Sequence, residues 1–180
     1  MSPKEGGKTG KMKNKEALSQ QFPGMVEEQH GGETIISCYQ CGTCASSCPV
    51  ARITDEFNPR EIIKLSLLGS KEEVISGDSI WLCCSCYNCQ ERCPQKVEIA
   101  DVIYALRNIA FKEGHIPNIY SEFISAVMNE GRIAKISKFT EGKRTTVGLP
   151  PLQPTGLDAL RKIFAATGFD KLQQKKGDEQ

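Results

Sequence analysis

The chain has 180 residues, nine of them cysteine, and 23 Lys and Arg against 22 Asp and Glu give a formal net charge of +1. This cysteine content is too low for a small disulfide scaffold, and the near-neutral charge does not favour nucleic-acid binding through overall charge. No apolar run exceeds five residues, so we expect no signal peptide and no membrane span, and we predict a cytoplasmic protein whose clustered cysteines serve metal or redox chemistry.

The N-terminal segment is rich in lysine. Residues 1–16 contain five lysines, two glutamates and several glycines, with no apolar pattern. Such a composition predicts a flexible basic tail over residues 1–17. We expect ordered structure to begin near Leu18–Val26.

Eight cysteines form two groups that repeat at a constant offset of 45 residues. Each group has the spacing C-x2-C-x2-C-x3-C-P. The first comprises Cys38, Cys41, Cys44 and Cys48, and the second comprises Cys83, Cys86, Cys89 and Cys93. This internal repeat is the strongest organisational signal in the sequence.

Two helices are predicted between the cysteine groups. Asn58 is a suitable N-cap, Pro59 fits the first helical position, and Gly69 ends the apolar pattern. A shorter helix is expected from about Lys71 to Ser76.

After the second group, apolar residues recur at helical spacing from Ile99 to Ile109, and again over 117–130. The segment 143–154 is polar and contains three prolines, which predicts a loop, and a last short helix is expected over 157–168. With no convincing run of alternating strand residues, the fold class is mostly α.

The repeated spacing predicts two [4Fe-4S] clusters. In ferredoxins with this run, the fourth cysteine of each motif binds the other cluster. One cluster is therefore expected on Cys38, Cys41, Cys44 and Cys93, and the other on Cys83, Cys86, Cys89 and Cys48. Structural zinc is a weaker alternative because it gains nothing from a crossed fourth ligand.

The remaining cysteine and the histidines suggest no further site. Cys84 has no partner in the repeat and is expected to be a small buried thiol near a cluster. His30 and His115 are expected on a loop and just beyond a helix, with no metal role. No catalytic residues are apparent.

The long helical segments between and after the motifs resemble the α-helical ferredoxin module. The stretches Cys38–Val50, Asn58–Glu61 and Trp81–Pro94 are similar to those of the small iron–sulfur subunit, the C-subunit, of heterodisulfide reductases. The resemblance implies an α-helical ferredoxin domain over 18–131 and a C-terminal extension, 132–180, with a short helix and a tail.

The same resemblance implies a non-catalytic electron-transfer subunit. It would relay electrons from a flavin-containing iron–sulfur subunit to a catalytic subunit with C-C-G domains, which reduces the coenzyme M–coenzyme B heterodisulfide of methanogenesis. A hydrogenase or formate dehydrogenase is a further expected partner, and nucleic acid is not. An independent dicluster ferredoxin, or the iron–sulfur subunit of another respiratory or sulfur-metabolism oxidoreductase, remains the alternative. The basic stretch 132–144 is either a solvated surface or a docking surface for an acidic partner.

Overall fold

The computed structural model describes residues 18–134, 136–153 and 155–168, which contain helices and turns but no strand. The mostly α prediction is confirmed. The predicted tail over residues 1–17 lies outside the described residues. The helices are α1 (Phe22–Glu27), α2 (Thr43–Ser47), α3 (Pro59–Leu68), α4 (Lys71–Ile75), α5 (Asn88–Glu91), α6 (Ile99–Lys112), α7 (Asn118–Glu130), α8 (Lys138–Thr146) and α9 (Leu157–Thr167), with two 3₁₀ turns, η1 (Ile35–Ser37) and η2 (Ser79–Leu82).

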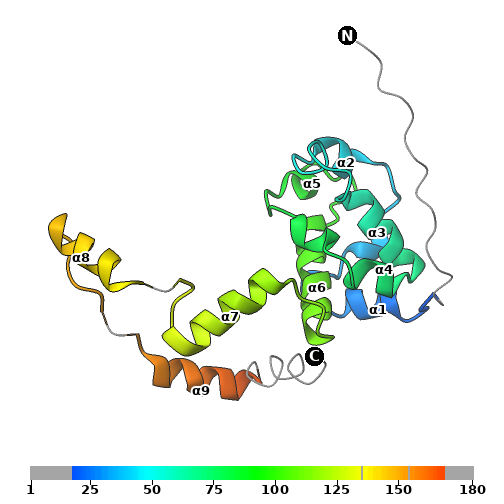
Figure 1. Ribbon diagram of the computed structural model, residues 1–180. Coiled ribbons are helices and arrows are strands. Elements are labelled where there is room, and N and C mark those ends of the chain that lie inside the picture. Colours follow the sequence, from blue (N-terminus) through cyan, green and yellow to red (C-terminus); the bar gives the residue numbers. More distant parts are fainter. Residues whose placement is uncertain (1–17, 135, 154, 169–180) are drawn as a thin grey trace, which may run out of the picture.

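Helices α1 to α6 pack into a helical body around α6 (Figure 1). Val102, Ile103 and Leu106 of α6 are almost fully buried. This helix contacts α1, α4, α5 and η2. Burial of its apolar stripe is the main stabilising term, at roughly 1.5–3 kcal/mol for each large aliphatic side chain.

The predicted N-cap and C-terminal glycine of α3 are confirmed. The Asn58 side chain accepts hydrogen bonds from the backbone amides of Arg60 and Glu61 at 3.1 and 3.2 Å. At the other end, Gly69 has a left-handed backbone with φ of 82°. These caps fix the direction of the chain between the two cysteine motifs.

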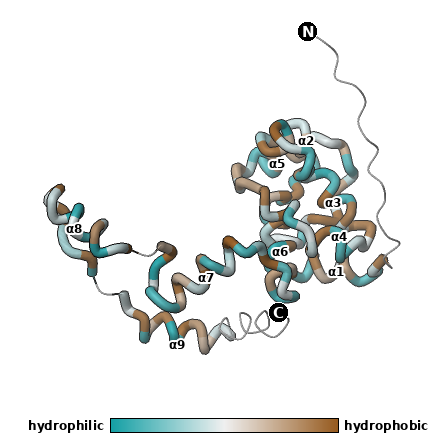
Figure 2. The backbone as a smooth tube through the Cα atoms, in the orientation of Figure 1, coloured by the Kyte–Doolittle hydropathy of each residue, from teal (hydrophilic) through white to brown (hydrophobic). Residues whose placement is uncertain are grey.

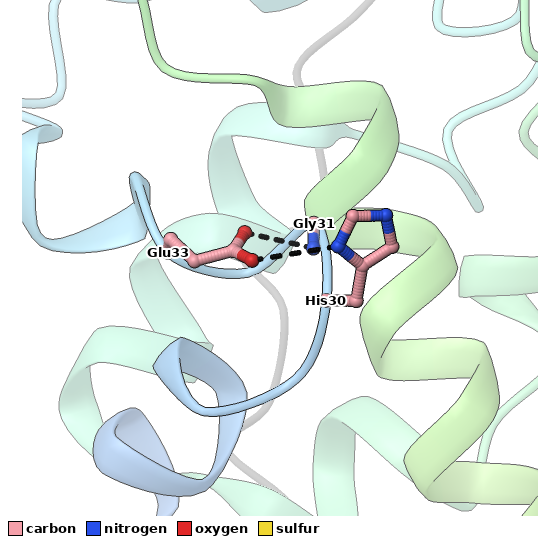
Figure 3. A network of polar contacts seen from close by, with 3 residues as sticks. All are labelled: His30, Gly31 and Glu33. Atoms are coloured by element: carbon pink, nitrogen blue, oxygen red, sulfur yellow. Dashed lines mark hydrogen bonds and ion pairs between the residues drawn. The ribbon is translucent and has the colours of Figure 1, made fainter.

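The loop that leads into the first motif is held by its own side chains (Figure 3). Glu33 accepts a hydrogen bond from the Gly31 amide at 2.8 Å and lies 3.6 Å from Nδ1 of His30. Backbone hydrogen bonding at Glu33 is the main cause that lowers the pKa of this carboxyl. His30 therefore lies on a loop, as predicted, and serves its local geometry.

Helices α7, α8 and α9 form a C-terminal arm that leads away from the helical body (Figure 1). The prediction of a loop over 143–154 is wrong at its start, because α8 continues to Thr146. The Ser137 hydroxyl caps α8 by accepting from the Thr140 amide at 3.2 Å, and Lys143 and Arg144 lie in its last turn. Those capping and charge signals outweigh the poor apolar pattern of this segment.

The arm buries little of its own surface. Helices α7 and α9 pack against each other, yet α7, α8 and α9 contain no buried residue. Hydrophobic residues, brown in Figure 2, recur along the arm. No helix within the described ranges is both long and apolar enough to cross a membrane.

Candidate metal centre

The two cysteine motifs begin with equivalent backbone structure. Each is preceded by a 3₁₀ turn, η1 before Cys38 and η2 before Cys83, and both cysteines have an extended backbone. Ile35 and Ile80, which correspond in the repeat, are both completely buried. The sequence repeat is thus a structural repeat, anchored at matching points of the core.

Left-handed backbone recurs at matching positions inside the motifs. Gln40 and Ser85 have φ of 66° and 55°, and Gly42 and Tyr87 have φ of 87° and 61°. Such residues turn successive amides toward one side and create concave anion-binding surfaces. Helices α2 and α5 follow directly, at Thr43 and Asn88.

The first three cysteines of each motif also repeat in their exposure to solvent, whereas in the fourth pair Cys48 is buried and Cys93 is half-buried. The middle pair, Cys41 and Cys86, is exposed, while Cys44 and Cys89 are each 8% exposed. Helices α2 and α5, which carry the buried pair, lie side by side at one end of the body (Figure 1). The fold therefore brings two motifs 45 residues apart to a common location.

One pocket collects the four cysteines predicted for the second cluster. Cys48 of the first motif lines this pocket together with three cysteines of the second motif. Apolar side chains complete the wall. The lining residues are Cys48, Val50, Phe57, Pro59, Cys83, Cys84, Cys86, Tyr87, Cys89, Ala100 and Ile103. The presence of Cys48 here is what crossed ligation requires.

The other predicted set is gathered around α2. Cys38 and Cys41 lie close enough to Cys44 to contribute to the shift of its pKa. The pKa of the Tyr39 phenol is raised mainly by a hydrogen bond with Cys41. The charge of Cys93 contributes to this rise. Cys93 therefore lies within electrostatic range of Tyr39 in the first motif.

The thiols within each set differ in their acidity. Burial is the main cause that raises the pKa of Cys44, and it raises the pKa of Cys89 to about 12, with a further contribution from Cys83. Hydrogen bonding to Thr43 lowers the pKa of the exposed Cys41 thiol. Because a buried thiolate needs a compensating positive charge, the buried thiols suit a bound cationic centre.

Backbone amides already point at cysteine sulfur in both motifs. The Ala51 amide donates to Cys48 Sγ at 3.5 Å, and the Val97 amide donates to Cys93 Sγ at 3.3 Å. Hydrogen bonds of this kind tune the potential of sulfur-bound clusters. Both involve the fourth cysteine of a motif.

Helix α6 holds the second motif through three side chains on one face. The Asp101 carboxylate accepts from Gln90 at 3.0 Å, Tyr104 donates to the Ser85 hydroxyl at 2.8 Å, and Arg107 donates to three backbone carbonyls. These residues are spaced by three, so they share a helix face. Their role was not predicted from the sequence.

Cys84 departs from its prediction, because its side chain is exposed and not buried. It follows Cys83, which has an extended backbone, and both residues line the pocket. Tyr39, its counterpart in the repeat, is likewise 59% exposed. Cys84 borders the pocket but stands outside both four-cysteine sets.

Each predicted set has the number of cysteines that a [4Fe-4S] cluster takes. Over the described ranges, no three Cys, His, Asp or Glu side chains converge closely enough to hold one metal ion. A [4Fe-4S] cluster instead takes one thiolate on each of four irons and needs four separated sulfurs. The apolar pocket is lined by five cysteines, of which four form the predicted set: Cys48, Cys83, Cys86 and Cys89.

Comparison with known proteins agrees with this description. Residues 34–97, which contain both motifs, match the family described as 4Fe-4S dicluster domain. The chain is 42% identical over 148 residues to the C-subunit of the H(2):CoB-CoM heterodisulfide,ferredoxin reductase of Methanothermobacter thermautotrophicus, covering 79% of this chain and 80% of that protein.

Two further relatives carry similar names. The iron-sulfur C-subunit of the CoB--CoM heterodisulfide reductase of Methanopyrus kandleri is 35% identical, over 82% of this chain and 81% of its own length. A protein of Archaeoglobus profundus, described as similar to the heterodisulfide reductase C-subunit, is 32% identical, over 82% and 80%. These matches include much of the arm as well as the motifs.

Proposed function

The chain belongs to the family of heterodisulfide reductase C-subunits, and from this membership and the geometry of the motifs we propose that it is the electron-relay subunit of such a complex. It would hold two [4Fe-4S] clusters, which supply one-electron transfer when bound. Cys38, Cys41, Cys44 and Cys93 would hold one, and Cys83, Cys86, Cys89 and Cys48 the other. The observation that carries the proposal is the pocket in which Cys48 joins three cysteines of the second motif.

The residues of this chain suit a relay more than a reaction centre. Apolar side chains line the set with Cys48, and backbone amides donate to the fourth cysteine of each motif, which favours electron transfer with little rearrangement. The exposed Cys41 and Cys86 lie at the surface, where electrons could enter and leave. The chain would accept electrons from a flavin-containing subunit and deliver them to the catalytic subunit that reduces the disulfide.

The C-terminal arm supports membership in a complex. Hydrophobic side chains on or beside α7–α9 are largely exposed: Ile119, Phe123, Ile133, Ile136, Phe139, Val147, Leu149 and Ile163. Residues 132–168 contain seven Lys and Arg against two Asp and Glu. An apolar surface with a basic rim fits an acidic surface of a partner subunit.

The cluster assignment is tested by anaerobic iron and sulfide analysis of the full chain. We expect about eight of each per chain. Cys48→Ser should impair the cluster of the second motif, and Cys93→Ser that of the first. About four irons per chain, or loss of the uncrossed cluster in each variant, would contradict the assignment.

The relay is tested with the three separate subunits. Reduced flavin subunit is mixed anaerobically with the catalytic subunit and the heterodisulfide, with and without this chain. We expect disulfide reduction to fall at least about tenfold without it. Equal rates in both mixtures would contradict the relay while leaving the cluster assignment intact.

A further inference from the structure

Arg107 connects α6 to the backbone at the start of the second motif. Its Nε donates to the Ile80 carbonyl at 2.9 Å, and its Nη2 donates to the carbonyls of Trp81 at 3.3 Å and Cys83 at 2.8 Å. Cys83 is one of the proposed cluster ligands. A single side chain thus fixes both the end of η2 and the backbone of a ligand.

The charge of this guanidinium is not neutralised by an ion pair. Its partners are neutral carbonyls and two aromatic rings, with its carbon 5.6 Å from the Trp81 centroid and 5.3 Å from the Tyr104 centroid. No carboxylate from the described part of the chain lies within 4.0 Å of it. Because Arg107 is half-buried, its positive charge is screened less than that of a surface arginine.

The first motif lacks the same arrangement. Arg52 donates to the Ser46 carbonyl at 3.2 Å, between Cys44 and Cys48 and not at the start of the motif. Among residues with described positions, no arginine donates to the carbonyl of Ile35, Ile36 or Cys38, the counterparts of the three carbonyls that Arg107 contacts. The contact therefore distinguishes the second motif from the first.

We propose that Arg107 is a positioning residue of the second motif and raises the reduction potential of the cluster bound there. This inference rests on the proposed function, since it requires a cluster at Cys83. Reduction adds a negative charge, and a nearby positive charge stabilises that reduced form. Arg107 would then favour the presence of the electron at the second motif.

The test compares three variants of the full chain carrying both clusters, by redox titration monitored by electron paramagnetic resonance. Arg107→Gln should make reduction of one cluster about tenfold less favourable, which is about 59 mV for one electron. Arg107→Lys keeps the charge but loses the planar guanidinium. It should make reduction of the same cluster only about threefold less favourable. Arg161→Gln makes the same chemical change on α9 and should leave the reduction potentials of both clusters unchanged.

The affected signal is assigned with Cys86→Ser, which alters the cluster of the second motif alone. Unchanged potentials in a fully loaded Arg107→Gln chain, equal shifts in Arg107→Gln and Arg107→Lys, or a shift of the other cluster would each overturn the inference. If Arg107→Gln does not retain its second cluster, a loss of about tenfold or more in the reducibility of that cluster in loaded Arg107→Lys, which keeps the charge, would overturn it. Failure of the unaltered chain to bind about eight irons would contradict the proposed function instead.

Discussion

Gly42 and Tyr87 occupy the same position of the two motifs, and both have a left-handed backbone, with φ of 87° and 61°. Glycine adopts this conformation without steric cost, whereas tyrosine loses roughly 1–2 kcal/mol. The Tyr87 side chain lines the pocket, and its hydroxyl lies 3.5 Å from Asp101. The motifs therefore share a backbone but differ in the side chains around it.

Gly42→Ala should destabilise the full chain by about 1 kcal/mol. A Cβ at this position meets no atom closer than 3.7 Å, so the cost comes from backbone conformation and not from a clash. Anaerobic urea unfolding measures the change. Gly24→Ala is the control. Gly24 is helical, and a Cβ added there meets no atom within 4 Å. The stability of this variant should therefore be unchanged or slightly increased. Equal destabilisation of both variants would contradict this explanation.

Cys84→Ser should leave the iron content and both cluster signals nearly unchanged. Cys84 is exposed and outside the proposed ligand sets. Cys86→Ser, two residues away, is the matched variant and should lose or alter about one cluster of the two. Iron analysis and electron paramagnetic resonance of both variants provide the measurement. Loss of iron in Cys84→Ser, with Cys86→Ser unaffected, would show that the ligand register is wrong.

Ile35→Ala and Ile80→Ala should each destabilise the protein by about 2–5 kcal/mol. The two isoleucines occupy equivalent positions and are both completely buried, so similar losses are expected from the two repeats. Ile53→Ala removes the same atoms at a site that is 87% exposed and should cost less than about 0.5 kcal/mol. Denaturant midpoints compare the three. A mild effect at only one of the buried positions would show that the repeats do not contribute equally to the core.

Much of the fold could be predicted from local signals. Asn58, Pro59 and Gly69 predicted α3, because capping depends on residues adjacent in the chain. The 45-residue offset predicted the equivalence of the motifs. These signals identify which residues act alike, and the structure adds which of them meet.

The contacts of α6 could not be predicted in this way. Asp101, Tyr104 and Arg107 have the spacing of an ordinary polar helix face, and nothing nearby in the sequence indicates which loop they contact. The exposure of Cys84 depends similarly on how the second motif is packed in the fold. Helix α8 has little apolar periodicity, so the Ser137 cap and the basic last turn are the local signals that could have indicated it.

The basic arm leads to a prediction about assembly. Arg144→Glu should slow association with the partner subunits about threefold to tenfold at low salt, because long-range attraction between a basic and an acidic surface mainly raises the association rate. Arg144 is half-buried on α8 and its Nη2 donates to the Pro150 carbonyl at 3.0 Å, so a modest local loss of stability is expected, whereas the iron content should not change. Surface-plasmon measurements with the immobilised partner subunits give the rate.

Lys64→Glu on α3 provides the control for the change of charge, since Lys64 is exposed and lies on the helical body. If the arm is the docking surface, Arg144→Glu slows association more than Lys64→Glu, and the difference shrinks as salt shortens the Debye length from roughly 10 Å at 0.1 M to 3 Å at 1 M. Equal slowing by both variants would indicate an effect of net charge alone. A difference that persists undiminished at high salt would indicate that Arg144 forms a close contact, and would contradict long-range steering by the arm.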